Sequence, residues 1–159
     1  MITTLNTATE DDKSIIAKLL QLYMYDFSEY TLDTINDHGE YIYNRLDCYW
    51  TEKDRYPFLI KTDDRLSGFA LVRSETINNE KVYYIAEYFI LRNYRNKGIG
   101  KKIAVGIFKM FQGKWKVPVL SCNTIGIKFW ENVVKEYTKD NYIKIDKVEW
   151  PGPVYEFNV

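Results

Sequence analysis

Residues 92–102 hold five basic side chains and no acidic one, in a segment where a strand pattern gives way to a helix pattern. Two glycines, Gly98 and Gly100, stand within it. The first amides of a helix have no intrahelical acceptor and the helix dipole is positive there, so a phosphate group finds donors and charge together. Glycine lets the backbone approach such a ligand. The segment predicts a phosphate-binding loop, with a solvated basic turn as the alternative.

The spacing within this segment argues against two common phosphate-binding motifs. A P-loop requires glycine, four residues and then Gly-Lys-Ser/Thr, but position 95 is Arg95 and Lys101 is followed by Lys102. The dinucleotide fingerprint requires a third glycine where this chain has Ile103, and the acidic residue expected about 20 positions later is missing. A nucleoside triphosphatase and a Rossmann-type site are therefore both disfavoured.

A lone carboxylate, Glu87, interrupts the most apolar stretch of the chain, between Ala86 and Tyr88. An ionisable group in an otherwise apolar strand needs a partner or a purpose. Burial among aromatic side chains raises the pKa of a carboxyl group toward the range in which it serves as a general base. Glu87 is therefore a candidate base, and an outward-facing residue paired with a lysine is the alternative.

The elements that must position these residues begin with two helical patterns. Apolar side chains recur at intervals of three and four residues and predict an amphipathic helix over residues 9–28. Thr9 and Asp12 form a predicted capping box at its start. A weaker pattern predicts a second helix over residues 40–50.

A strand pattern follows from Pro57 onward. Residues 58–60 and 66–72 predict a hairpin, and residues 81–91 a third strand rich in Tyr, Phe and Ile. We expect these strands to form an antiparallel meander.

The second half of the chain predicts a crossover unit. A helix from Ile99 ends at Gly113, and residues 115–122 form the next strand, so this strand and the strand 81–91 should be parallel. Pro118 lacks a backbone donor and indicates an unpaired side. A helix over residues 126–137 and two final strands, residues 142–150 and 154–159, complete the prediction.

Composition describes an ordinary globular chain of 159 residues, with 46% hydrophobic and 28% charged side chains. We expect one domain over residues 1–159, without a membrane span, a cleaved signal or a metal site, in the cytoplasm. The net charge is zero, but residues 1–80 carry 15 acidic and 8 basic side chains, and residues 81–159 carry 7 acidic and 14 basic ones. The two halves therefore present opposite fields.

The loop, the strand that follows the next helix and the helix after it share a recognisable pattern. The residues that carry it are Arg95, Gly98, Gly100, Asn123, Phe129 and Trp130. This pattern resembles the GNAT superfamily of acetyl-CoA-dependent N-acetyltransferases, specifically in residues 81–137 and more loosely over nearly the whole chain. The resemblance implies an α/β (mixed α+β) fold: a central, mostly antiparallel, twisted sheet of six or seven strands with a splayed parallel pair, and about four helices on both faces.

The resemblance also implies acetyl-CoA as the cofactor and a set of residues that hold it. The loop amides would wrap the pyrophosphate and the preceding strand end would line the pantetheine arm. Asn123 would hydrogen-bond that arm, with ordinary helix capping as the alternative, and Phe129 and Trp130 would pack on it or belong to the core. The implied cofactor-binding residues are Ile90, Leu91, Arg92, Arg95, Asn96, Lys97, Gly98, Ile99, Gly100, Lys101, Asn123, Phe129 and Trp130.

Acetyl transfer to an amine needs a base and an acid, because a free amine is mostly protonated at neutral pH and the leaving thiolate must regain a proton. The resemblance places the base on the strand of Glu87. Many relatives carry a tyrosine where this chain has Trp130, whose indole cannot protonate a thiolate. Tyr137, two helical turns later, is the candidate acid, with a solvent proton or another tyrosine as alternatives.

The acceptor is expected at the acidic, aromatic first helices, which would attract a cationic amine of a small molecule or peptide, although a solvated helix face is the alternative. The candidate acceptor-binding residues are Tyr23, Asp26, Tyr30 and Tyr88. The predicted function is direct N-acetyl transfer in a ternary complex, by a monomer or homodimer. A non-catalytic acyl-CoA-binding or sensor module is the alternative. A nucleic-acid-binding module is disfavoured, because no basic stripe follows a whole face.

Overall fold

A twisted sheet of seven strands runs through the described part of the chain, residues 1–146 and 150–159 of a computed structural model. The strands lie in the order β1-β2-β3-β4-β5-β7-β6, and each neighbouring pair is antiparallel except β4 and β5, which are parallel. This arrangement confirms the predicted mixed fold. The strands are β1 (Thr3–Thr7), β2 (Arg55–Thr62), β3 (Arg65–Ile77), β4 (Glu80–Ile90), β5 (Lys114–Pro118), β6 (Ile143–Asp146) and β7 (Pro153–Asn158).

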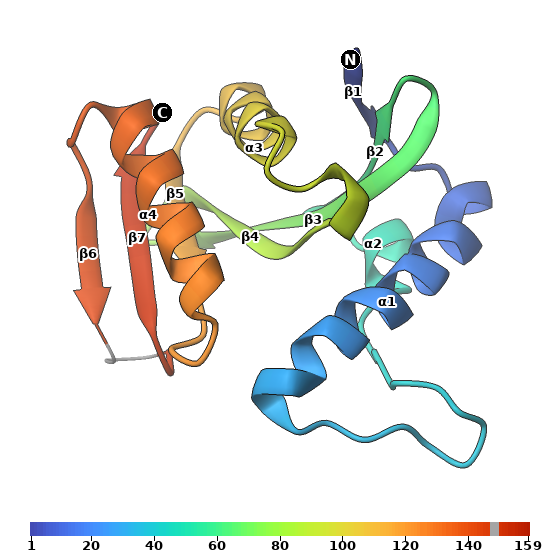
Figure 1. The fold of residues 1–159 in the computed structure, drawn as a ribbon. Coiled ribbons are helices and arrows are strands. Elements are labelled where there is room, and N and C mark those ends of the chain that lie inside the picture. Colours follow the sequence, from blue (N-terminus) through green and yellow to red (C-terminus); the bar gives the residue numbers. More distant parts are fainter. Residues whose placement is uncertain (147–149) are drawn as a thin grey trace.

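The helices cover both faces of this sheet, as predicted (Figure 1). α3 and α4 pack on one face, and α1 and α2 pack on the other. Two short 3-10 helices, Glu10–Asp12 and Arg92–Tyr94, precede α1 and α3. The four α-helices of the described residues are α1 (Lys13–Thr31), α2 (Cys48–Thr51), α3 (Ile99–Met110) and α4 (Thr124–Thr138).

The alternation of side chains along β3 divides the core into two halves. Ala70 and Val72 face α3 and α4, whereas Phe69 and Leu71 face α1 and α2. All four are fully buried. When both faces of a strand are covered, its sequence is a continuous apolar run, and this is why the sequence of residues 66–72 predicts a strand.

The first helix begins at the predicted capping box, in which the Thr9 amide donates to the Asp12 carboxylate at 2.9 Å. It ends three residues later than predicted, at Thr31, and the left-handed backbone of the following Leu32 (φ 59°) closes the last turn. The predicted helix over residues 40–50 is wrong except for its end, which forms α2. Backbone groups at Tyr41 bond instead to the Gln21 amide at 2.8 and 2.9 Å, so this segment lies extended against α1.

The ends of the sheet differ from the sequence prediction. β1 was not predicted, because it is a short, polar and largely exposed edge strand that pairs only with β2. β5 ends at Pro118 rather than at residue 122, and the amide of Val119 bonds to the carbonyl of Pro153. The predicted strand over residues 142–150 appears as β6, while residues 147–149 lie outside the described residues.

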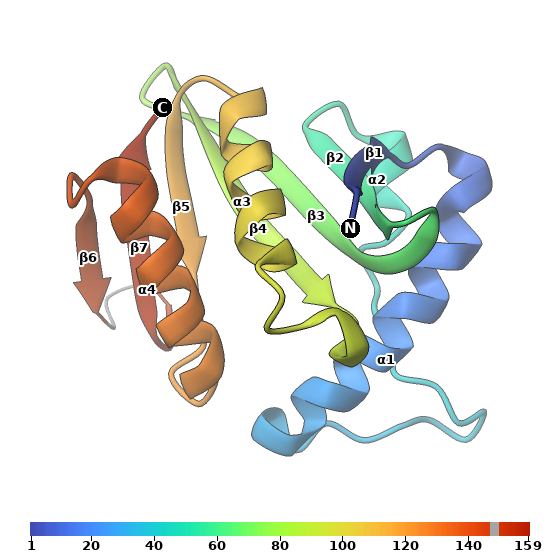
Figure 2. The same cartoon turned by 45° about the horizontal axis from the view of Figure 1, so that its top comes forward.

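The parallel pair separates along its length, and this separation opens the sheet. Val82 to Tyr84 of β4 pair with Lys114 to Lys116 of β5, and no further pairs follow in the described residues. Figure 2 shows the two strands side by side at one end and diverging toward the loop that leads into α3. The predicted splay and the predicted unpaired side of Pro118 are therefore confirmed. The start of α4 and the end of α1 flank the opening (Figure 2).

Candidate active site

A β-bulge in β4 positions the candidate base. Leu71 of β3 lies opposite Glu87, but the next residue, Val72, lies opposite Ile85, so Ala86 is the extra residue. Ile85 and Tyr88 pack toward α3 and α4, while Ala86 packs toward α1. The bulge thus turns two consecutive side chains, Ala86 and Glu87, toward the face that α1 and α2 cover.

Tyrosine hydroxyls surround the Glu87 carboxyl group. Tyr43 donates a hydrogen bond to its Oε1 at 3.2 Å, and the hydroxyl of Tyr23 on α1 lies close to it. Burial raises the pKa of Glu87, although these two hydroxyls act in the opposite direction. Burial and the neighbouring carboxylate also raise the pKa values of Tyr23 and Tyr43. The alternative of an outward-facing Glu87 paired with a lysine is therefore wrong.

A cavity of about 560 Å³ occupies the opening between β4, α1 and the start of α4. Residues from four elements and the loop before α3 form its wall. They are Tyr23, Asp26, Phe27, Glu29, Tyr30, Tyr88, Phe89, Ile90, Arg92, Arg95, Asn96, Gly98, Gly100, Lys101, Asn123, Ile125, Gly126, Phe129 and Trp130. The structure therefore brings most of the predicted cofactor residues together with all four predicted acceptor residues.

A second cavity, of about 190 Å³, lies on the bulged side of β4. Glu87 lines this smaller cavity, and Tyr23, whose hydroxyl lies close to the Glu87 carboxyl group, lines the larger one. The side chains around the smaller cavity are Tyr43, Arg45, Tyr49, Arg55, Arg73, Tyr84, Ile85, Ala86, Glu87, Pro118 and Trp150. The pair Glu87–Tyr23 thus stands between the two cavities.

The loop before α3 presents backbone amides to the larger cavity. Gly98 is the N-terminal cap of α3 and adopts a left-handed conformation (φ 75°), which glycine takes at little cost. The amides that follow it, of Ile99 to Lys101, belong to the first helical turn and lack intrahelical acceptors. A Cβ at Gly100 would lie 3.2 Å from the Phe129 ring, so its absence lets α3 approach α4 closely.

One carboxylate pairs with two arginines of this loop and offsets part of their charge. Arg92 and Arg95 each place an Nη2 atom 2.5 Å from a different oxygen of Asp26 on α1. Burial raises the pKa of Asp26, but the hydrogen bonds from both arginines outweigh this and hold it below its ordinary value. Arg95 also donates from Nε to the carbonyl of Ile90 at 2.7 Å. Asp26 of α1 is therefore paired with the loop before α3 rather than standing free for a cationic acceptor.

The aromatic wall of the larger cavity is tightly packed. The Tyr88 ring stacks on Phe129, with centroids 6.0 Å apart, and meets Trp130 edge-on at 5.0 Å. The Tyr88 hydroxyl donates to the carbonyl of Gly100 at 2.5 Å. Asn123 accepts the Gly126 amide at 2.8 Å, so it does cap α4 while lining the cavity. The Asn123 capping alternative is thus observed, and it fixes the side chain at the cavity wall.

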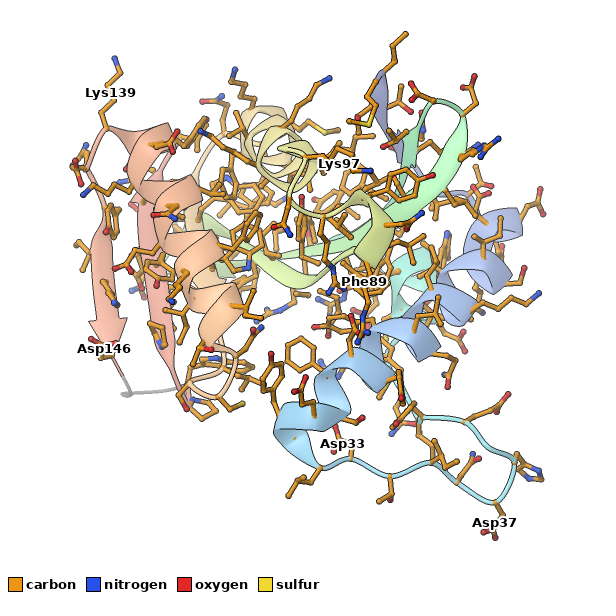
Figure 3. The ribbon with its side chains drawn as sticks, in the orientation of Figure 1. Asp33, Asp37, Phe89, Lys97, Lys139 and Asp146 are labelled. Carbon is orange, nitrogen blue, oxygen red and sulfur yellow. The ribbon has the colours of Figure 1, made fainter. Side chains whose placement is uncertain are left out.

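Four predicted site residues lie outside the lining of both cavities. Leu91 packs against the core under α1, and the side chain of Ile99 is buried at the start of α3. Lys97 donates to the carbonyl of Asn93 at 2.8 Å. Figure 3 marks Lys97 just before α3. Tyr137 lies in the last turn of α4, against Phe108 and Phe157, whereas the first turn of that helix reaches the cavity.

The position of Tyr137 corrects the prediction that it supplies the acid. Fourteen residues separate it from Asn123, which corresponds to about 21 Å along a helix. The sequence placed Tyr137 on the face of Trp130, but only Trp130 lines the larger cavity, whereas Tyr137 packs against the core and lines neither cavity. We therefore do not retain it as a catalytic group.

Several lining residues of the smaller cavity were missed, because they come from separated segments without any common spacing. Tyr43, Arg45 and Tyr49 stand in and after the segment wrongly predicted as a helix. The hairpin turn alone gives no signal for this site: it pairs Thr62 with Arg65, and only the β-bulge between Ile60 and Lys61 shifts the register so that Arg55 lies opposite Arg73.

Two other kinds of feature are absent from residues 1–146 and 150–159. Within residues 1–146 and 150–159, no three His, Cys, Asp or Glu side chains are grouped so as to hold a metal ion. Over the same residues, none of the helices has both the length and the apolar character that crossing a membrane requires.

Three solved acetyltransferases have a fold similar to that of this chain. An acetyltransferase from Thermus thermophilus has a TM-score of 0.74 at 12% identity, over 100% of this chain and 98% of that one. The PaiA N-acetyltransferase from Thermoplasma acidophilum, in complex with coenzyme A, has a TM-score of 0.64 at 14% identity over 100% of both chains. The aminoglycoside acetyltransferase meta-AAC0020 from an uncultured soil metagenomic sample, in complex with sisomicin, has a TM-score of 0.64 at 17% identity, over 82% of this chain and 86% of that one.

Sequence comparison gives the family directly. No curated protein sequence matches the chain significantly. The model of the acetyltransferase (GNAT) family matches residues 16–133, which run from α1 into α4. This range includes β4, whose residues line both cavities. The chain therefore belongs to the acetyltransferase (GNAT) family.

Proposed function

We propose that this chain transfers the acetyl group of acetyl-CoA directly to the amine of a small molecule or peptide, within a ternary complex. The observation that carries the proposal is the pair Glu87–Tyr23: Glu87 lines the smaller cavity and Tyr23 lines the larger one. Two substrates that enter from the two cavities meet at a buried group with a raised pKa, as general base catalysis requires.

The larger cavity fits acetyl-CoA by the chemistry of its wall. First-turn amides of α3 and the Cβ-free Gly98 suit a pyrophosphate, and Arg92, Arg95 and Lys101 add positive charge. Apolar and aromatic side chains suit the pantetheine arm. Acetyl-CoA supplies the acetyl group and a thiolate leaving group. The residues that would hold it are Ile90, Arg92, Arg95, Asn96, Gly98, Gly100, Lys101, Asn123, Phe129 and Trp130, with the amide of Ile99.

Glu87 acts as the base in this proposal. Its carboxylate takes a proton from the ammonium group of the acceptor, which leaves a neutral nitrogen able to attack. A raised pKa makes this carboxylate a stronger base than a carboxylate in water, since burial disfavours its charged form. The hydroxyls of Tyr23 and Tyr43 hold it in place.

Tyr23 then returns a proton to the side of the larger cavity. Once protonated, Glu87 can donate to the Tyr23 oxygen while the Tyr23 hydroxyl proton passes into the cavity that Tyr23 lines. The two groups end in their starting protonation states, and the second proton that the nitrogen loses as the amide forms is released to solvent. Tyr88 is less suited, because its hydroxyl already donates to the carbonyl of Gly100.

Direct transfer is favoured over a covalent enzyme intermediate. Cys122 is exposed and lines neither cavity, so no thiol is placed to accept the acetyl group. The PaiA N-acetyltransferase and the aminoglycoside acetyltransferase with a similar fold support an amine as the acceptor.

The test is thiol release from acetyl-CoA with a panel of amines, for wild type and three variants. Glu87→Gln should lower kcat by about 100-fold or more, and Tyr23→Phe should also lower it, while the acetyl-CoA Kd measured by calorimetry changes little. Tyr137→Phe is the matched control and should keep full kcat. Unchanged turnover in Glu87→Gln would remove Glu87 from the mechanism. Acetyl-CoA binding without turnover of any amine would identify a sensor module instead.

A further inference from the structure

The smaller cavity has a strongly basic wall around Glu87. Three arginines line it, Arg45, Arg55 and Arg73, against one carboxyl group in the described lining. Resting on the function proposed above, we infer that the acceptor is a small amine that also carries a carboxylate, an amino acid rather than a polyamine or aminoglycoside. Its ammonium would meet Glu87 and its carboxylate the arginines.

Two of these arginines face each other across neighbouring strands. Arg55 of β2 is the direct cross-strand partner of Arg73 of β3, so their side chains leave the same face of the sheet. Like charges directly opposite one another destabilise a sheet. Arg73 in turn lies opposite Tyr84 of β4, with its guanidinium 3.9 Å from the ring centroid. Arg55 and Arg73 both line the smaller cavity, where an anionic ligand would relieve the repulsion between their two positive charges.

Glutamates at the rim compensate part of this charge. Arg55 bonds to Glu52 at 2.8 Å, and Arg73 approaches Glu75 at the longer distance of 3.5 Å. Both glutamates are about half exposed, so solvent weakens these pairs. Arg45 is exposed and makes no ion pair within residues 1–146 and 150–159. A guanidinium can bind a carboxylate through two parallel hydrogen bonds, which give geometric selectivity as well as charge.

The size of the cavity favours a small acceptor. Its volume of about 190 Å³ lies below the range of roughly 300–1,000 Å³ that is usual for drug-sized ligands. Tyr43, Tyr49, Tyr84 and Trp150 supply flat apolar walls. An amino acid head group with part of its side chain suits this space, and a three-ring polycation does not.

The acidic half of the chain does not provide a competing cation site at Glu87. Asp26 is already paired with two arginines of the cofactor loop. Asp37 lies on the outer bend of the loop after α1, pointing away from the rest of the protein (Figure 3). The negative charge counted in residues 1–80 is therefore not concentrated where the amine must react.

The test compares amino acids with the same molecules lacking the carboxylate: lysine with cadaverine and tyrosine with tyramine, plus spermidine as a polycation. Wild-type enzyme should show at least about ten-fold higher kcat/KM for the carboxylated member of a pair, the value expected for losing a charge-assisted hydrogen bond. Arg45→Gln should raise the KM of the amino acid by a similar factor and leave the KM of acetyl-CoA and of the decarboxylated amine unchanged. Arg65→Gln, at an exposed arginine outside both cavities, is the control.

Equal or better turnover of cadaverine, tyramine or spermidine would overturn the inference while leaving acetyl transfer intact. If wild type turns over no amine, the proposed function fails, and binding decides the inference separately. Lysine and tyrosine are then titrated by calorimetry into the coenzyme A complex of wild type and Arg45→Gln. Saturable binding that weakens about ten-fold in the variant supports the anion site, and the absence of saturable binding overturns it.

Discussion

Gly98 offers a direct test of how the loop before α3 is built. Its φ of 75° lies in the left-handed region, and a Cβ there would meet no atom within 4 Å. Gly98→Ala therefore adds backbone strain without a steric clash, and it should lower the free energy of unfolding by about 1–2 kcal/mol. Because strain is relieved by moving the loop, the acetyl-CoA Kd should rise several-fold as well.

The matched control is Gly106→Ala, the same chemical change in the interior of the same helix. Gly106 also has no atom within 4 Å of a built Cβ, and its backbone is not left-handed. Alanine there should stabilise α3 by about 1 kcal/mol. The two variants should therefore lie on opposite sides of wild type in urea unfolding, and their free energies of unfolding should differ from each other by about 2–3 kcal/mol.

Gly98→Asn sharpens the test, because asparagine tolerates the left-handed region better than alanine does. It should recover part of the lost stability and affinity. The reasoning would be refuted if Gly98→Ala and Gly106→Ala changed the free energy of unfolding equally, or if Gly98→Ala left both stability and acetyl-CoA affinity at wild-type values.

Two further predictions concern charges at the cavities. Burial raises the pKa of Glu87 above its ordinary value of 4.5, so the folded state keeps this proton to higher pH than the unfolded state does. Relative to its value below pH 4.5, the free energy of unfolding therefore falls as pH rises and Glu87 must ionise in the folded protein. Glu87→Gln should therefore have a higher free energy of unfolding than wild type near pH 7, and the difference between the two proteins should become smaller toward pH 4. Urea unfolding at a series of pH values measures this difference. A difference that grows on acidification would contradict the prediction. Asp26→Asn should free Arg92 and Arg95 and tighten acetyl-CoA binding several-fold at low salt, less at 0.5 M salt; weaker binding in calorimetry would show instead that Asp26 positions the arginines.

Local spacing predicted the elements with strong internal periodicity. The capping box at Thr9, the apolar face of α1 and the change of period at Pro57 are properties of neighbouring residues, and the structure contains each of them. The helix predicted over residues 40–50 failed for the complementary reason. Its backbone is held by Gln21, a residue about 20 positions away, and no local pattern reports that bond.

The cofactor side of the site followed from sequence more closely than the acceptor side. A strand, a glycine-containing basic loop and a helix are contiguous, so their order in the chain already brings amides and charge to one place. Even here the chain alone could not show that Asp26, 66 and 69 residues before Arg92 and Arg95, pairs with both.

What the sequence determined by itself was the family, the mixed fold and the phosphate-binding character of residues 92–102, because these depend on periodicity and spacing along the chain. Only the tertiary structure decided that Glu87 joins two cavities, that Tyr137 faces the core and that Arg55 opposes Arg73. Each of these depends on strand register, on the bulge at Ala86 or on the length of a helix. A shift of one residue in a strand reverses which face a side chain occupies, so such contacts are fixed only when the whole sheet has formed.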